Sequence, residues 1–86
     1  MKITYKNKKI EKVYTNRYEA EKLYSSEMAE KIHQCIDKIQ AFNTVEELIQ
    51  FRIRRCHPLK GNRKGQYAMD LVHPYRLIFI KKGTEI

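Results

Sequence analysis

The segment QYAMDLVHPYRLIFI, residues 66–80, carries the clearest signal of the fold. Larger apolar side chains alternate with smaller or polar ones from Tyr67 to Leu71, and a mainly apolar run follows from Tyr75 to Ile80, so the segment predicts two strands. The pair His73-Pro74 between them predicts a turn. Both faces of the second strand carry apolar residues, which predicts that it lies in the centre of a sheet.

Arg76 lies within the second of these strands, on the face opposite Leu77. Its side chain can pair with Asp70 or lie along apolar neighbours, which is the ordinary structural explanation. It can also clamp a phosphate, because the planar guanidinium group matches two phosphate oxygens. The sequence leaves both explanations open.

A basic segment, RRCHPLKGNRKGQY at residues 54–67, leads into the first strand. Its cations surround a turn bounded by Gly61 and Gly65, and they are Arg54, Arg55, Lys60, Arg63 and Lys64. The turn lacks the GxxxxGK[ST] pattern of a P-loop and no helix follows it, so we expect a hairpin turn. These cations predict contacts with RNA phosphates, although a solvated basic turn has the same composition.

His57 lies among these cations, and with Lys60 and Arg76 it supplies the groups that RNA cleavage without a metal requires. Such cleavage needs a group that takes the 2′-hydroxyl proton, a group that protonates the departing 5′-oxygen, and cations around the phosphorus. Strict alternation puts Lys60 on the face opposite His57. The two therefore converge only if Pro58 or the Gly61 turn interrupts the strand.

The aromatic residues and the two other histidines also bear on this site. Tyr67 and Tyr75 can stack on unpaired bases, although aromatic side chains in strands more often belong to the core. His33 lies beside the apolar stripe of a predicted helix, and His73 lies in the predicted turn. We assign neither histidine a catalytic role.

The first half of the chain is predicted to be helical. Asn7 can cap a first helix, residues 17–23 predict a second, and Ser25 or Ser26 can cap a long third helix. An apolar stripe at spacings of three and four marks the third helix and consists of Met28, Ile32, Cys35, Ile36, Ile39 and Phe42. A capping box at residues 44–47 predicts a fourth, short helix.

Residues 2–5 alternate and predict a short edge strand before these helices. We therefore expect one α+β domain over residues 1–86, with N-terminal helices packed on one face of a small antiparallel sheet. The other face of that sheet remains available to a ligand.

The net charge of +8 is concentrated in the second half of the chain. Residues 1–51 hold nine Lys/Arg against eight Asp/Glu, whereas residues 52–86 hold nine against two. A field of this sign favours nucleic acid, an anionic membrane surface or an acidic protein.

Cys35 and Cys56 form no CxxC motif, so neither a zinc site nor a disulfide framework is predicted and a reducing cytoplasm is expected. No apolar run is long enough to predict a signal peptide or a membrane span.

The motif HPLKG at residues 57–61, continued by NRKGQY, and the motif YRLIF at residues 75–79 follow this helical half. In these motifs and their separation, the chain resembles the HigB branch of the RelE/ParE toxin superfamily over essentially its whole length. Members of that branch are small, basic, ribosome-associated endoribonucleases that a helix-turn-helix antitoxin binds and silences. The resemblance implies a RelE-like fold of helices against an antiparallel sheet.

Position by position, the resemblance implies an acid-base role for His57 and phosphate-stabilising roles for Lys60 and Arg76. It implies cleavage of mRNA on the ribosome without a cofactor, and a hetero-oligomer with a HigA-like antitoxin. Relatives continue past the position of Ile86 with a strand that ends in an acidic-Tyr-His motif, and we expect that strand to be absent here.

Two other functions fit the same residues. The chain can be an inactive module that only binds RNA, or that binds the antitoxin as a co-repressor; such a module would show salt-sensitive RNA binding without cleavage. It can also be a ParE-like gyrase inhibitor, which shares the fold. The gyrase inhibitor ranks last because His57 and Lys60 match the nuclease branch.

Overall fold

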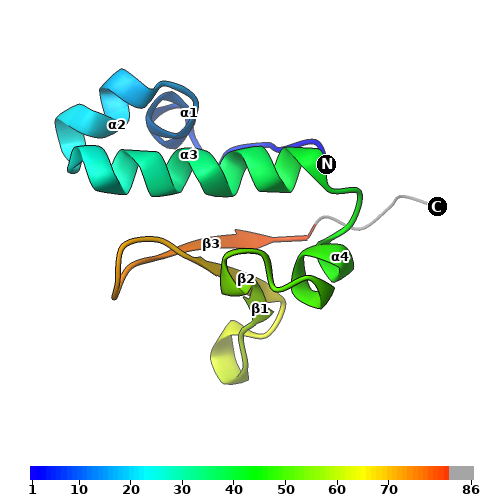
Figure 1. Ribbon diagram of the computed structural model, residues 1–86. Helices are drawn as coiled ribbons and strands as arrows, with labels where there is room; N and C mark the ends of the chain where they lie inside the picture. Colours follow the sequence, from blue (N-terminus) through cyan, green and yellow to red (C-terminus); the bar gives the residue numbers. More distant parts are fainter. Residues whose placement is uncertain (82–86) are drawn as a thin grey trace.

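The computed structural model describes residues 1–81, and it confirms the α+β prediction. Four helices precede a three-stranded antiparallel sheet, and α3 lies across one face of that sheet (Figure 1). The α-helices and strands are α1 (Lys8–Thr15), α2 (Arg17–Leu23), α3 (Ser26–Ala41), α4 (Val45–Gln50), β1 (His57–Pro58), β2 (Gln66–Asp70) and β3 (Arg76–Ile80). Two short 3₁₀ helices, η1 (Ile53–Arg55) and η2 (Gly61–Arg63), lie before and after β1. The expected C-terminal difference from the toxins falls on residues 82–86, outside the described part.

The helices begin where the sequence places their caps. The side chain of Asn7 accepts a hydrogen bond from the third residue of α1, and Ser25 does the same for α3. Thr44 and Glu47 form the predicted capping box of α4. Asn16, which was not predicted as a cap, accepts two backbone hydrogen bonds at the start of α2. Each cap satisfies N–H groups that the helix itself leaves unpaired.

The predicted stripe on α3 forms the centre of the core. Its buried members pack with Leu48 of α4 and with Met69 and Leu77 of the sheet. On its other side α3 meets α1 and α2, which lie away from the sheet (Figure 1), around a small cluster that includes Ala20 and Ala29. This burial, not intrinsic propensity, supplies most of the stability of helices this short.

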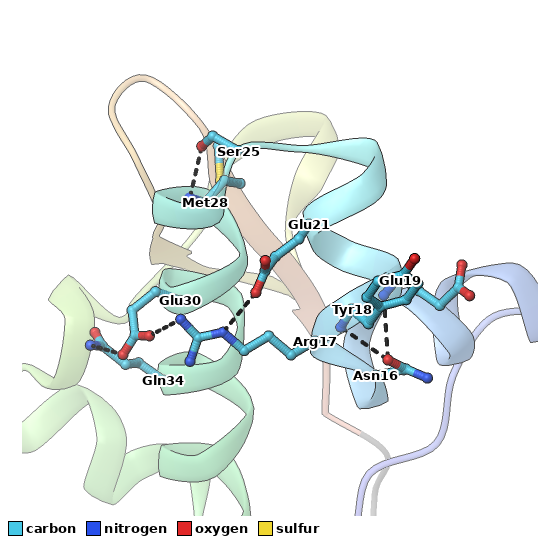
Figure 2. A network of polar contacts seen from close by, with 9 residues as sticks. All are labelled: Asn16, Arg17, Tyr18, Glu19, Glu21, Ser25, Met28, Glu30 and Gln34. Carbon is cyan, nitrogen blue, oxygen red and sulfur yellow. Dashed lines mark hydrogen bonds and ion pairs between the residues drawn. The ribbon is translucent and has the colours of Figure 1, made fainter.

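Arg17 joins α2 to α3 on the surface. Its guanidinium group forms ion pairs with Glu21 of its own helix and with Glu30 of α3, as Figure 2 shows. Glu30 also accepts a hydrogen bond from Gln34. The helical layer therefore neutralises this cation within itself.

The predicted edge strand at residues 2–5 is wrong, because these residues form an irregular segment beside the helices. The amino group of Met1 donates to the carbonyl oxygens of Ile39, Gln40 and Phe42 at 3.0, 2.9 and 2.6 Å. The alternation of apolar and polar residues in this segment nevertheless predicted which side chains are partly buried, since Ile3 and Tyr5 pack against the core. The segment packs these side chains against the core without pairing with a strand.

The strand order is β1-β2-β3, so within residues 1–81 β2 is central and β3 lies at an edge. The prediction of a central strand at residues 75–80 is therefore wrong for the described part of the chain. Paired residues share a face, and the pairs Tyr67↔Phe79 and Met69↔Leu77 face the helices. The opposite face, called the open face below, consists of His57, Gln66, Ala68, Asp70, Arg76, Ile78 and Ile80.

Both thiols are buried and free, and burial raises the pKa of each. For Cys56 the pKa rises from 9.0 to about 11. Neither cysteine is therefore prepared to act as a nucleophile near neutral pH. Across residues 1–81, no helix has both the length and the apolar character needed to cross a membrane.

Candidate nucleic-acid interface

His57 and Arg76 lie on the open face, on the two outer strands of the sheet. His57 pairs with Ala68 of β2, and Arg76 pairs with Asp70 of the same strand. These partners are two residues apart, which is roughly 6–7 Å along a strand, and the two outer strands lie about two strand spacings, roughly 9–10 Å, apart across β2. The structure therefore brings two of the three predicted catalytic residues to one surface, on either side of β2.

The imidazole of His57 has a defined orientation. Its Nδ1 atom lies 2.7 Å from the carbonyl oxygen of Arg55. A carbonyl oxygen only accepts hydrogen bonds, so Nδ1 carries the proton and Nε2 of the neutral ring keeps its lone pair. The side chain is half-exposed, and Nε2 is therefore chemically suited to take a proton from a bound hydroxyl group.

The carbonyl group that orients His57 belongs to an unusual backbone turn. Arg54 and Arg55 have φ values of 49° and 53°, in the left-handed region. Such a conformation costs roughly 1–2 kcal/mol per residue that is not glycine. Strain of this kind gathers at functional sites, where the surrounding structure holds it in place. No residue type in the sequence signals this turn, and sequence reasoning missed it.

Arg76 does not form the ion pair with Asp70 that would give it an ordinary structural role. The Asp70 carboxylate instead pairs with Nε of Arg55 at 3.3 Å. Within residues 1–81 no carboxylate lies within 4.0 Å of the Arg76 guanidinium group, and the side chain is exposed. Its hydrogen-bond donors are thus directed to solvent and available to an anionic ligand.

Arg54, predicted to contact RNA, points into the protein instead. Its Nε and Nη2 atoms donate to the carbonyl oxygen of Asp70 at 3.2 and 3.0 Å. The same oxygen accepts a hydrogen bond from Sγ of Cys35 at 3.6 Å. This arrangement favours a structural role for Arg54, which anchors the left-handed turn to the end of β2.

Lys60 is not brought together with His57 and Arg76. It lines a separate hollow with Pro58, Lys64 and Tyr67, the last of which faces the helices. Arg63 lies on the same turn and donates from Nε to the side-chain oxygen of Gln66 at 3.1 Å. The predicted hairpin turn is present, with Gly61 and Gly65 at φ values of 66° and 94°.

Tyr75, the remaining predicted contact, is 63% exposed and lies in the turn before β3.

Residues 1–81 contain no cluster of three His, Cys, Asp or Glu side chains that is arranged to hold a metal ion. Comparison of the chain with protein-family models, with curated proteins and with solved structures finds no match. The interface is therefore interpreted from its own geometry and chemistry.

Proposed function

We propose that this protein is a type II toxin of the HigB kind, an endoribonuclease that cleaves mRNA on the ribosome in the cytoplasm. One observation carries the proposal: His57 and Arg76 share the open face, where the imidazole has a free Nε2 and the guanidinium group has no carboxylate partner among residues 1–81. The HPLKG and YRLIF motifs at residues 57–61 and 75–79 support the same function.

The proposed reaction is an attack by the 2′-hydroxyl of RNA on the adjacent phosphate. Nε2 of His57 takes the hydroxyl proton as the bond between 2′-oxygen and phosphorus forms. The bond from phosphorus to the 5′-oxygen breaks, and the leaving oxygen takes a proton from water. The products are a 2′,3′-cyclic phosphate and a 5′-hydroxyl. Arg76 binds the non-bridging oxygens, where negative charge increases in the transition state.

Lys60 has a different role in this proposal. Because it shares its hollow with Lys64 and not with His57, it contacts the RNA backbone away from the reacting phosphate. Lys60, Lys64 and Arg63 then position the strand by charge alone. The excess of cations in residues 52–86 draws the protein to ribosomal RNA and to an acidic surface of a HigA-like antitoxin.

The test is to add the purified protein to translating ribosomes and to map the ends of the mRNA. Cuts that leave a cyclic phosphate and a 5′-hydroxyl are expected, and they should disappear in the presence of a copurifying helix-turn-helix protein. Intact mRNA in the presence of a folded protein would contradict the proposal.

A second candidate is an RNA-binding or co-repressor module that does not cleave. The separation of Lys60 from His57 and Arg76 favours it, because one predicted cation is missing from the reacting centre. This candidate predicts salt-sensitive RNA binding with no cut ends in the ribosome experiment. The same measurement therefore distinguishes the two functions.

A further inference from the structure

A hollow beside Arg76 contains polar side chains that the proposed reaction does not use. It lies at the turn between β2 and β3, and these unused side chains are Arg55, Asp70, His73 and Tyr75, with Arg76 lining the hollow as well. Its volume is about 280 Å³. Pockets for small ligands occupy roughly 300–1,000 Å³, so this smaller hollow has room for at most one nucleotide unit.

The hollow attracts anions although it contains a carboxylate. Asp70 is neutralised by Arg55 at 3.3 Å, which leaves the Arg76 guanidinium group as the uncompensated charge. The His73 imidazole also lines the hollow, and in either tautomer one of its ring nitrogens carries a proton that can be donated. A phosphate group therefore finds a full positive charge and additional donors here.

Tyr75 offers an aromatic surface that the core does not use. Its side chain is 63% exposed, whereas Tyr67 on β2 stacks on Phe79 at 5.6 Å between ring centroids. The backbone around Tyr75 is held by two hydrogen bonds, from its N–H to Val72 at 2.7 Å and from Leu71 to its carbonyl oxygen at 3.0 Å. A ring on a fixed backbone can stack on an unpaired base with little loss of entropy.

The hollow also lies at a useful distance from the reacting centre. Arg76 lines it and shares the open face with His57, which lies on the other side of β2 and two residues along it. This separation, roughly 6–7 Å along the strands and roughly 9–10 Å across them, is comparable to one to two nucleotides of an extended single strand. A strand whose reacting phosphate contacts His57 and Arg76 therefore brings its neighbouring nucleotide to the turn.

We propose that this hollow is a second nucleotide subsite for single-stranded RNA, in which Tyr75 stacks on the base next to the cleaved bond and His73 binds that nucleotide's phosphate. The inference rests on the proposed function and deepens it, because it names the part of the RNA that the protein grips. Stacking is tolerant of base identity, so the subsite selects unpaired RNA and not a particular sequence.

The test is the affinity of a short fluorescent RNA whose 2′-hydroxyls are replaced by hydrogen, so that it binds without being cleaved. Tyr75→Ala should weaken binding by about tenfold or more because it removes the stacking surface. Tyr75→Phe should bind as the native protein does because it keeps that surface. His73→Ala should weaken binding by a few-fold. Tyr18→Ala and His33→Ala are matched controls, because both residues are exposed on helices, and neither should alter affinity.

Abasic substitution of one nucleotide at a time locates the stack. At one position, removal of the base should abolish the difference between the native protein and Tyr75→Ala. A Tyr75→Ala variant that binds as tightly as Tyr18→Ala, or whose defect is the same at every abasic position, would overturn the proposal. Inorganic phosphate and a mononucleotide can also be compared as competitors. If phosphate displaces the RNA as effectively as the mononucleotide does, the base makes no contribution and the stacking on Tyr75 is ruled out.

The two proposals fail in different ways. Tyr75-dependent binding without cut mRNA would reject the nuclease and keep the subsite. Cut mRNA with unchanged binding by Tyr75→Ala would keep the nuclease and reject the subsite. Unfolding curves of each variant show whether a lost signal reflects lost folding.

Discussion

The helical layer and the sheet handle their charges in opposite ways. In the helices, Arg17 lies between Glu21 and Glu30, and Glu19 accepts ion pairs from two lysines. In the sheet, Arg76 has no carboxylate partner among residues 1–81. Exposed ion pairs add only about 0–1 kcal/mol each to stability, so their main effect is to make the helical surface neutral. On the sheet, the charge of Arg76 is left uncompensated by a carboxylate among residues 1–81.

The two regions also differ in their backbone. The helices begin at standard side-chain caps, and the sheet is preceded by three left-handed arginines, Arg52, Arg54 and Arg55. One region is built for stability, and the other keeps strain and exposed charge that a ligand can use. Four comparisons of variants with matched controls test this division.

The largest effect is expected in the core below α3. Leu48 is fully buried, and Leu48→Ala should lower the free energy of unfolding by about 2–5 kcal/mol because it leaves a cavity. Ile80, which is 61% exposed on the open face, is the control, and Ile80→Ala should change it by less than about 0.5 kcal/mol. Urea titration measures both. Equal losses would mean that the open face is covered in solution.

The next effect concerns the open face. His57→Ala and Arg76→Ala should each slow mRNA cleavage by about 10²-fold or more, because each removes a group that acts in the transition state. His33→Ala and Arg17→Ala are the helical counterparts and should cleave at the native rate. Primer extension on ribosome-bound mRNA gives the rates, and circular dichroism confirms folding. If His33→Ala or Arg17→Ala slowed cleavage as much as His57→Ala or Arg76→Ala, the proposed division between a stabilising helical layer and a reactive sheet would be wrong.

A smaller effect is expected where the helical layer meets the sheet. Arg52 follows the end of α4 with a φ of 54°, a position at which glycine is favoured. Arg52→Gly should therefore raise the free energy of unfolding by about 1 kcal/mol. Lys38→Gly, in the regular helix α3, should lower it by about 1 kcal/mol. Loss of stability in Arg52→Gly would show that this arginine makes a contact that outweighs its strain.

The sequence predicted the helical layer closely because its signals are local. Caps at Asn7, Ser25 and Thr44 and the stripe on α3 each depend on residues three or four positions apart. The order of the strands depends on partners distant in sequence, which is why residues 75–80 were placed in the centre of the sheet and residues 2–5 in a strand.

The candidate site was also predicted only in part, because its contacts join residues that no local sequence pattern connects. Alternation predicted that Lys60 and His57 point to opposite faces unless the strand is interrupted, and the structure keeps them in separate places. The inward turn of Arg54 and the pairing of Asp70 with Arg55 had no signal in the sequence. Both follow from left-handed residues that are not glycine, a conformation that composition does not reveal.

The smallest effect tests the cations on the hairpin turn. Arg63 and Lys64 are exposed on that turn, and Lys8 and Lys9 are exposed on α1. If the turn contacts the RNA backbone, the double variant R63A/K64A should reduce the slope of log affinity against log salt by about 1.4, since each contact with a single strand contributes about 0.7. The double variant K8A/K9A has the same loss of net charge and should leave the slope unchanged. Titration of uncleavable RNA at four salt concentrations gives both slopes. Equal reductions would mean that RNA responds to the total charge of the protein and not to the turn.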